Sequence, residues 1–492
     1  MLVPAEQPKQ GVAAVGITAH DGGHGMDYEM ARRPETWLLA LAGIAWFGCG
    51  ADGGVAGLLA AAVPGALLLG SATGSLLFPG DRLIPRAGAT GALVGLVFAV
   101  LLLLFAPLTA LLLGALSAAA GLAAARLTAE DLERVEGQPV PGLDLQVAAE
   151  IALDEAVIGT LTTFMGVYSR PIQARVGEEL EETLDWVRAG GWMNEPASFH
   201  ETPPSMGPVA VAPARTAGLD YEVMRYQSEF EPRRGAPGRE RWLGYVKNRN
   251  AEVRIIRAQR SRDWLICIHG LAMGHAPLDL RAMGAGWLHR HGVNLAFPVL
   301  PLHGPRAIHS LASGAGFITG DVANTLHALT QTAWDVRRLV AWLREEGAER
   351  IGLVGLSLGG YSTALIASLE DDIDCAIAGI PAAEFGELTC YHASGRALAK
   401  AAEARITPER IAAALTPVAP LMLTPRIPRE QRFIFGALAD RFVPPTQVEA
   451  LWRHWDCPEI TWYPGGHLGF RFHPSVRELV DRALGATLLR PR

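Results

Sequence analysis

Apolar residues are concentrated in the N-terminal part of the chain. Residues 1–35 are polar, rich in glycine and aperiodic, which predicts a disordered tail. Residues 36–78 then contain one charged side chain, Asp52, and residues 87–125 contain none. As a single helix, each of these two stretches would be about 60 Å long, twice the thickness of a hydrocarbon core of about 30 Å. Each stretch is therefore predicted to fold as a helical hairpin.

Small residues and a proline mark the turns of the two hairpins. The turns are placed at 50–54 and at Ala106-Pro107, and the abundance of Gly and Ala suits close helix packing in lipid. A buried hairpin of a soluble domain is the alternative, and an uncharged run of this length disfavours it. The spans predicted in a transmembrane region of residues 36–126 lie near 36–51, 54–78, 87–106 and 108–126.

Basic residues are distributed asymmetrically around these four spans. Those that flank the spans all fall on one side: Arg32, Arg33, Arg82, Arg86, Arg126 and Arg134. Because cytoplasmic loops carry the excess of Lys and Arg, both ends of the chain are predicted to be cytoplasmic. The pattern thus predicts an integral membrane protein that contacts membrane lipids and carries its large C-terminal part on the cytoplasmic side.

From about residue 127 the pattern becomes that of a water-soluble protein. Residues 127–219 are predicted to form a linker and an amphipathic helical extension, with helices at 145–165 and 174–190. After residue 220, short apolar runs alternate with helical patterns, which predicts a mostly parallel sheet covered by helices on both faces. The predicted strands are 222–230, 252–258, 264–268, 293–299, 351–356, 375–380, 432–436 and 459–463, and the later helices are 330–346, 359–370, 446–455 and 475–489.

The composition excludes several classes of function. A net charge of −7 argues against a dedicated nucleic-acid binder. The five cysteines lie far apart without a C-x-x-C pair, so neither a zinc site nor a disulfide framework is predicted. His20, Asp21 and His24 are of metal-binding types, but the predicted tail gives them no fixed scaffold, so no metal site is predicted there.

A G-x-S-x-G motif, Gly355-Leu356-Ser357-Leu358-Gly359, joins the predicted strand 351–356 to a predicted helix. This pattern is typical of a nucleophile elbow, in which the serine sits on a sharp turn from strand to helix. A Cβ at Gly355 or Gly359 would collide with a neighbouring element, so both positions require glycine. The turn is expected to expose Ser357 at the carboxyl end of the sheet, beside a helix N-terminus that favours developing negative charge.

The predicted strand 264–268 ends in His269-Gly270-Leu271. In a sheet of this kind, the loop after such a strand and the residue after the nucleophile donate the two N–H groups of an oxyanion hole. The expected donors are therefore the backbone N–H groups of Leu271 and Leu358. His269 is expected to brace this loop or to lie at the rim of the pocket, and not to be catalytic.

Two further loops offer an acid and a base. Asp440 follows the predicted strand 432–436 and is the candidate acid, with Glu384 and Asp374 as competitors near the preceding strand. His467 follows two glycines that are expected to let its loop bring the imidazole over Ser357 as general base. The competing histidines lack this glycine context: His473, His454 and His392.

The order Ser357, Asp440, His467 resembles that of the α/β-hydrolase superfamily, and the chain is similar to this family from about residue 220 to 490. It looks most like the esterase, lipase and dienelactone-hydrolase-like branch. The resemblance implies an α/β-hydrolase fold whose Ser-His-Asp triad cleaves esters through an acyl-enzyme, without a metal or organic cofactor. It also implies that His303 and Arg306, in a Pro-x-His-Gly-x-Arg loop, line the pocket rim or only brace the loop.

The resemblance gives residues 220–492 the role of a catalytic domain with a lid-like insertion near 381–431. Helical patterns at 385–403 and 408–415 lie in that insertion. The expectation from the sequence is thus a membrane-anchored serine hydrolase acting on a small-molecule or lipid ester. The alternatives are a serine peptidase or acyltransferase on the same fold and, outside enzymes, a non-catalytic membrane interaction module.

Overall fold

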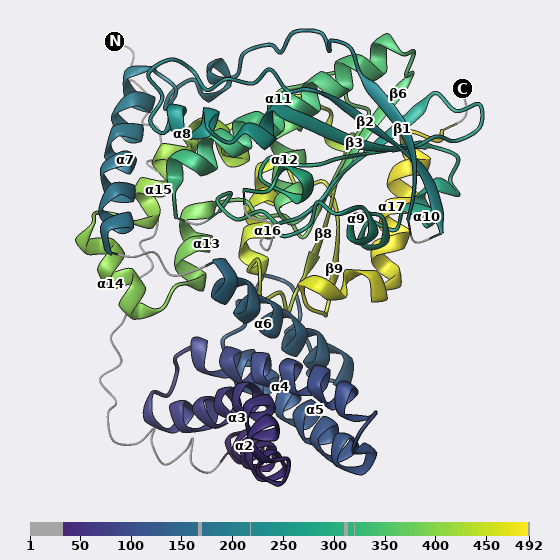
Figure 1. Cartoon of the computed structure of the whole chain (residues 1–492). Helices are drawn as coiled ribbons and strands as arrows, with labels where there is room; N and C mark the ends of the chain where they lie inside the picture. The colour runs from purple at the N-terminus through teal and green to yellow at the C-terminus, as the bar shows by residue number, and fades with distance from the viewer. Residues whose placement is uncertain (1–32, 166–169, 217, 309–312, 319, 491–492) are drawn as a thin grey trace, which may run out of the picture.

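The chain folds into a bundle of apolar helices and a larger α/β domain, with one helix lying between them (Figure 1). The structure is a computed structural model that describes residues 33–165, 170–216, 218–308, 313–318 and 320–490. Most of the predicted N-terminal tail lies outside these ranges, and so do the residues considered above for a metal: His20, Asp21 and His24.

Four helices form the N-terminal bundle: α2 (Pro34–Asp52), α3 (Gly54–Leu77), α4 (Leu83–Leu102) and α5 (Pro107–Ala129). They match the four apolar segments and the two hairpin turns predicted from the sequence. Among the described helices, α3, α4 and α5 are long and apolar enough to cross a membrane. The helix expected near 36–51 therefore forms as α2, but it does not reach the apolar character of the other three.

Large apolar side chains cover the outside of this bundle, and its interior combines many small residues with a few large ones such as Trp46 and Leu68. Trp37, Leu59 and Phe105 are among the many large apolar side chains exposed there. Inside, α2 and α3 approach so closely that a Cβ on Gly65 would lie 2.7 Å from the ring of Phe47. Small residues inside and large apolar residues outside are typical of helices that pack together in lipid.

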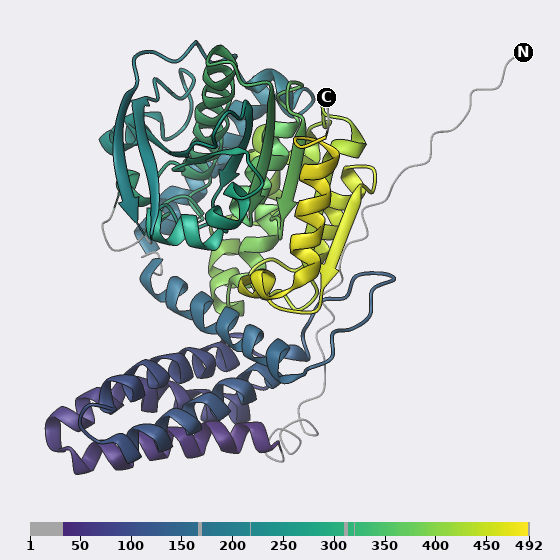
Figure 2. The same ribbon diagram turned by 90° about the vertical axis from the view of Figure 1, so that its right-hand side faces the viewer.

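Four of the described arginines that flank the predicted spans lie at the start of α2, at the start of α4 or in the last turn of α5: Arg33, Arg82, Arg86 and Arg126. This end of the bundle leads into α6 and the α/β domain (Figure 2). Arg33 forms an ion pair with Glu130, so the start of α2 and the end of α5 lie side by side. Arg82 lies 3.5 Å from Asp131, and Arg86 is buried. The basic end of the bundle is thus also the end that leads into the rest of the chain.

Nine strands of the α/β domain form one sheet in the order β1-β2-β3-β5-β4-β6-β7-β8-β9. The six strands from β5 to β9 in this order are parallel, and β1, β2 and β3 join them as antiparallel strands. This is the mostly parallel sheet predicted from the sequence. The strands are β1 (Ala210–Thr216), β2 (Leu219–Gln227), β3 (Asn250–Ile256), β4 (Asp263–Ile268), β5 (Asn294–Pro298), β6 (Arg350–Leu356), β7 (Cys375–Gly379), β8 (Arg432–Ala437) and β9 (Glu459–Tyr463).

Strand β1 is the one strand that the hydrophobic pattern did not predict. It lies at the edge of the sheet, pairs with β2 alone, and is mostly exposed. An exposed edge strand has no buried face to give it an alternating pattern, and Pro213 is tolerated there because an edge strand leaves some N–H groups unpaired. The sheet therefore begins at Ala210, ahead of the predicted boundary at 220.

Helices cover both faces of the sheet, as expected for a parallel sheet (Figure 2). One face packs against α9, α10 and α17, and the other against α11, α12 and α16. Three short helices form the insertion between β7 and β8, where the sequence predicted helices at 385–403 and 408–415. The bounds are α8 (Arg239–Leu243), α9 (Ala276–Ala282), α10 (Ala285–His289), α11 (Val322–Glu345), α12 (Leu358–Ala367), α13 (Phe385–His392), α14 (Gly395–Glu403), α15 (Pro408–Leu415), α16 (Pro445–His454) and α17 (Pro474–Ala486).

The predicted helical extension joins the bundle to the α/β domain. It consists of α6 (Leu145–Met165) and α7 (Arg170–Ala189). Helix α6 lies across the carboxyl ends of the parallel strands, between the sheet and helices α4 and α5 (Figures 1 and 2). The edge of the sheet at which a nucleophile elbow opens therefore faces the apolar bundle.

Candidate active site

Ser357 occupies the turn between β6 and α12, with a strained backbone (φ 57°, ψ −114°) that a non-glycine residue rarely adopts. The flanking glycines are enforced by packing. A Cβ on Gly355 would lie 2.0 Å from the carbonyl oxygen of Gly359, and a Cβ on Gly359 would lie 2.0 Å from that of Ile268. The predicted elbow therefore forms, and its serine is half-buried at the carboxyl end of the sheet.

The loop after β4 lies directly against this elbow. A Cβ on Gly270 would be 3.5 Å from the Cβ of Ser357. Leu358 is the first residue of α12, so its N–H has no intrahelical acceptor. Within the described part of the chain, neither this N–H nor that of Leu271 donates to a protein acceptor. The two N–H groups that the sequence predicts as oxyanion donors are thus without a protein acceptor in the described structure.

Asp440 and His467, the candidate acid and the candidate base, are in direct contact. They follow β8 and β9, and the His467 Nδ1 lies 2.6 Å from the Asp440 Oδ2. The other oxygen of Asp440 accepts hydrogen bonds from the N–H groups of Phe442 and Val443, which fixes the carboxylate. The ring of Phe442 stacks on the imidazole at a centroid distance of 4.8 Å.

Ser357 and His467 lie at the carboxyl ends of β6 and β9 and thus at the same edge of the sheet. No hydrogen bond joins the Ser357 hydroxyl to His467 among the described residues. Such bonds are often long in unliganded enzymes and tighten when substrate binds.

The competing residues have other partners. Glu384 caps the N-terminus of α13, and Asp374 accepts a hydrogen bond from the backbone at the start of β6. His392 and His454 bind backbone carbonyl groups, while His473 binds a carboxylate of α6. None of these five side chains contacts the Asp440–His467 pair through a hydrogen bond of the described structure.

The charge of the site favours a protonated imidazole. Burial alone would lower the pKa of His467, but Asp440, and to a smaller extent Asp154, stabilise the imidazolium and hold the pKa above its ordinary value. Once the imidazole is deprotonated, its raised pKa makes it a stronger base for the serine proton. Asp440 thus both orients the imidazole and stabilises its charged form.

Three carboxylates of α6, which were not predicted as site residues, contact the loops that carry this pair. Asp154 is fully buried and accepts hydrogen bonds from three backbone N–H groups: His467 at 2.6 Å, Leu468 at 3.1 Å and Arg441 at 3.3 Å. One side chain of the helical extension therefore binds both the acid-bearing and the base-bearing loop. Burial, and next the negative charge of Asp440, raise the pKa of Asp154 to about 7.

Glu150 lies one helical turn before Asp154 and binds the same loop. Its Oε2 accepts a hydrogen bond from the Gly466 N–H at 2.9 Å, and it also contacts His473 at 3.2 Å. A Cβ on Gly465 or Gly469 would lie 1.9 Å from the Glu150 Oε2. The glycines were expected to let the loop reach Ser357; the structure shows that they also leave room for the carboxylates of α6.

The third carboxylate, Glu155, connects the bundle to the acid-bearing loop. It lies 2.7 Å from the Arg86 Nε of α4 and 2.7 Å from the Nε of Arg441, the residue after Asp440. All three side chains are almost completely buried. Burial alone would raise the pKa of Glu155, but the two arginines hold it below its ordinary value. Arg86, assigned from the sequence to the flank of a span, thus belongs to a buried ionic network.

A sequence signal for these residues exists. Glu150, Asp154 and Glu155 follow one another at helical spacing in a segment whose other positions are largely apolar. Buried charges require partners, so three carboxylates in a largely apolar helix indicate a polar contact rather than a solvent-facing surface. That contact lies more than 280 residues away along the chain, and no local pattern names its partner.

The structure distinguishes the two roles expected for three residues, bracing a loop or lining the pocket rim. It favours the bracing role for His269, His303 and Arg306. All three are buried. The Nε2 of His269 accepts a hydrogen bond from the Leu300 N–H, while Arg306 binds two backbone carbonyl oxygens and Asp335. Burial lowers the pKa of His269 and of His303 to about 3, so both imidazoles are neutral at pH 7.

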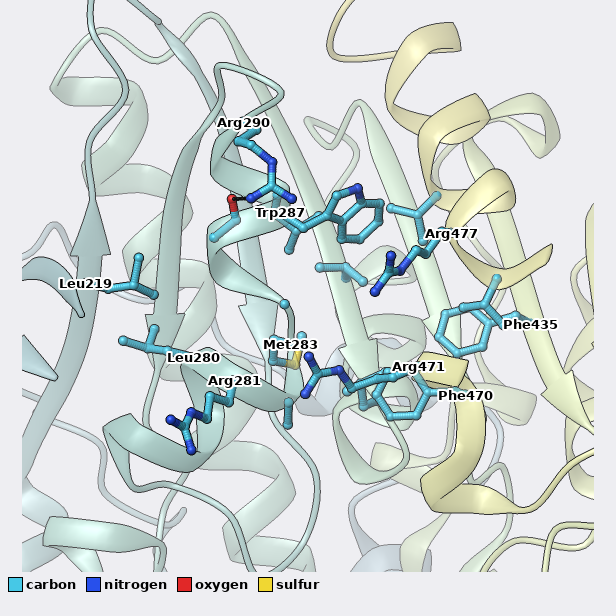
Figure 3. Close-up of a pocket in the computed structure, with 18 residues that line it drawn as sticks. Leu219, Leu280, Arg281, Met283, Trp287, Arg290, Phe435, Phe470, Arg471 and Arg477 are labelled. Carbon is cyan, nitrogen blue, oxygen red and sulfur yellow. Dashed lines mark hydrogen bonds between the residues drawn. The ribbon is translucent and has the colours of Figure 1, made fainter. Parts of the chain in front are cut away.

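A cavity of about 350 Å³ lies on one face of the sheet, between α9 and α10 on one side and α17 on the other (Figure 3). Phe435 and Leu356 contribute to its floor, and Trp287 and Phe470 to its walls. It contains none of the residues of the candidate triad. In the described part of the chain, no group of three or more His, Cys, Asp or Glu side chains is arranged to hold a metal ion.

The strand order, the elbow at Ser357 and the Asp440–His467 pair define a member of the α/β-hydrolase superfamily, as the resemblance implied. No protein-family model matches the chain. Two curated relatives from Mycobacterium tuberculosis, the uncharacterized protein Rv2627c (strain ATCC 25618 / H37Rv) and the uncharacterized protein MT2702 (strain CDC 1551 / Oshkosh), are each 39% identical over 349 residues. The alignments cover 70% of this chain and 84% of each relative, and the chain belongs to their family.

Solved structures of esterases are also similar to the chain. An acetyl xylan esterase from Paenibacillus sp. R4 has 17% identity and a TM-score of 0.43, over 62% of this chain and 94% of that enzyme. An S-formylglutathione hydrolase from Agrobacterium tumefaciens has 14% identity and a TM-score of 0.38, over 56% and 98%.

The buried network around Glu155 predicts a large loss of stability when its carboxylate is removed. Glu155→Gln leaves two buried guanidinium groups without their counter-charge, which should lower the free energy of unfolding by about 3–5 kcal/mol. The half-exposed pair of Glu181 with Arg410 supplies the matched control, because Glu181→Gln should cost at most about 1 kcal/mol. Denaturant unfolding of both purified variants measures the difference, and equal losses would contradict the prediction.

Proposed function

We propose that this protein is a membrane-anchored serine hydrolase that cleaves carboxylic esters. The observation that carries the proposal is the 2.6 Å contact between His467 and Asp440 at the sheet edge where the strained elbow presents Ser357. A serine on such a turn, a histidine at the same edge and a carboxylate that orients the histidine are the parts of an acyl-transfer site. Two free N–H groups beside the serine complete this set.

The reaction follows from these positions. The Ser357 Oγ attacks the ester carbonyl carbon while the His467 Nε2 accepts the serine proton. The negative charge that develops on the carbonyl oxygen is stabilised by the N–H groups of Leu271 and Leu358. The tetrahedral intermediate then expels the alcohol, which takes the proton from His467. Water, activated by the same imidazole, hydrolyses the acyl-enzyme and releases the carboxylic acid.

The substrate class that we propose is a lipid-like ester taken from the membrane. Its support is the position of the site: the carboxyl edge of the sheet faces α6 and the apolar bundle (Figure 2). If the bundle lies in the bilayer, then acyl esters reach this edge at high local concentration. The exposed apolar surface of α3, α4 and α5 supports that placement of the bundle.

We further propose that the α/β domain lies on the cytoplasmic side. The ion pair of Arg33 with Glu130 brings the chain before α2 next to the chain after α5, so both lie on one side of the membrane. The described arginines Arg33, Arg82 and Arg126 lie at that same end, and cytoplasmic flanks carry the excess of basic residues. Helix α2, although less apolar, runs along α3 and makes the number of crossings even.

Removal of the nucleophile tests the proposed chemistry directly. Ser357→Ala should abolish labelling by a fluorophosphonate probe and ester hydrolysis, because no other hydroxyl occupies the elbow. Ser362→Ala is the matched control and should label like the wild type. Ser362 lies in α12, the helix that follows Ser357, and its hydroxyl donates a hydrogen bond to a backbone carbonyl. Mass spectrometry of the labelled peptide identifies the modified serine. Labelling of Ser357→Ala at the wild-type level would disprove the triad assignment.

The assignment of the acid predicts a contrast between two carboxylates. Asp440→Asn should lower kcat by about 10⁴-fold, because the amide no longer holds the imidazole in the correct tautomer. Glu384→Gln should change kcat little, since Glu384 caps a helix and does not contact His467. Steady-state kinetics with a p-nitrophenyl acyl ester compares them. A larger loss in Glu384→Gln would transfer the acid role to the earlier strand.

The proposed sidedness is tested with topology reporters. A reporter fused to the C-terminus should give the cytoplasmic signal, because an even number of crossings returns the chain to its starting side. One inserted after Asp52, in the turn between α2 and α3, should give the opposite signal. A C-terminal reporter on the outer side would show that α2 does not cross and that the α/β domain faces outward.

A further inference from the structure

Helix α6 covers the site and also binds the two loops that carry Asp440 and His467. Its buried Asp154 accepts hydrogen bonds from the N–H groups of His467 and Leu468 in one loop and from Arg441 in the other. These are the two loops whose separation sets the contact between Asp440 and His467. Because a single carboxylate binds both, a shift of α6 changes the relative position of acid and base.

The same helix is held by the apolar bundle. Glu155, the next residue along α6, contacts Arg86 near the start of α4 as well as Arg441. One turn further, α6 and α4 approach so closely that a Cβ on Gly159 would lie 2.1 Å from the Thr90 hydroxyl. The position of α6 is therefore determined by the bundle on one side and by the loops of the triad on the other.

We propose that Asp154 and Glu155 are positioning residues of the triad and that, through them, the membrane helices set the geometry of the catalytic site. This inference rests on the proposed function of Ser357, Asp440 and His467. Asp154 holds the base-bearing loop and, when it is ionised, places a second negative charge near the imidazolium. Glu155 ties the acid-bearing loop to Arg86, so movement of the bundle in the bilayer is transmitted to the proposed catalytic pair.

The charged groups that surround His467 define the expected pH effect. Asp440 contacts the imidazole, and Asp154 binds the backbone N–H of the same residue. Glu150 and Tyr463 bind Gly466 in its loop, and Arg441 is paired with Glu155. The first two carboxylates raise the pKa of His467 against the opposing effect of burial. The pKa of Asp154 is itself about 7, so its negative charge is present over the upper part of the acidic limb of the kcat/KM profile. Removing that charge lowers the pKa of His467 in this range, and the acidic limb moves to lower pH.

The first test replaces the charge and keeps the shape. Asp154→Asn in the full chain, reconstituted in phosphatidylcholine nanodiscs, should lower kcat by about a hundredfold with little change in KM, as expected for a misplaced catalytic group. Its acidic limb should move below that of the wild type. Asp144→Asn is the matched control, because Asp144 caps the start of the same helix and contacts no triad loop. It should leave both kcat and the acidic limb unchanged.

The second test moves the helix without changing any charge. Gly159→Val inserts a branched side chain between α6 and α4, away from the triad. It should lower kcat by about tenfold, although His467 and the two carboxylates near it are unchanged in sequence. Gly48→Val in α2, where no atom lies within 4 Å of the added Cβ, is the control and should leave kcat unchanged. The rate of labelling by a fluorophosphonate probe gives a readout independent of the substrate.

The outcomes separate the two proposals. If wild-type Ser357 is not labelled, the proposed function fails. If the wild type is active and both Asp154→Asn and Gly159→Val match it in kcat and pH profile, the positioning role fails while the function stands. Thermal unfolding followed by tryptophan fluorescence identifies variants that have lost the fold. If Asp154→Asn has lost the fold, Asp154→Glu, which retains the charge, takes its place. Activity with a wild-type acidic limb in Asp154→Glu supports the positioning role. An acidic limb that has moved to lower pH, as expected for a neutral side chain, overturns it.

Discussion

The hydrogen bonds from the triad loops to the carboxylates of α6 are the interaction on which the rest of this structure depends. A buried carboxylate is costly unless several donors stabilise it, and here the donors are backbone N–H groups of the loops that carry Asp440 and His467. The glycines of the base-bearing loop are required because Glu150 lies where their side chains would be. The same contacts therefore hold the loops of the site in place and dock the N-terminal region onto the α/β domain.

This arrangement also accounts for the orientation of the α/β domain. A sheet of this kind opens its active site at the carboxyl ends of its strands, and that edge is covered by α6 and turned toward the apolar bundle (Figures 1 and 2). A domain attached by a flexible linker alone would have no fixed orientation relative to its anchor. The buried Arg86–Glu155–Arg441 network and the close approach at Gly159 make this attachment rigid.

Much of the fold follows from local patterns in the sequence. Uncharged runs of Gly, Ala and Leu predicted the four helices of the bundle, and apolar runs between helical patterns predicted eight of the nine strands. The missing strand, β1, is an exposed edge strand with Pro213 within it, so it has no buried face to detect. Ser357, Asp440 and His467 were found because each follows a recognisable strand in a known order. Asp154 and Glu155 were not, because their role is defined by partners on loops far along the chain.

The sharing of buried groups between the two parts has a consequence for where this protein can be divided. The linker near residue 137 resembles a domain boundary in composition, yet the segments on both sides of it supply atoms to one desolvated cluster. A fragment that began after α6 would expose the backbone amides of Gly466 and His467 to water and leave Arg441 without a counter-ion. The buried polar groups of the α/β domain thus find their partners on the helix before it, and a division of the chain that keeps these contacts falls ahead of α6.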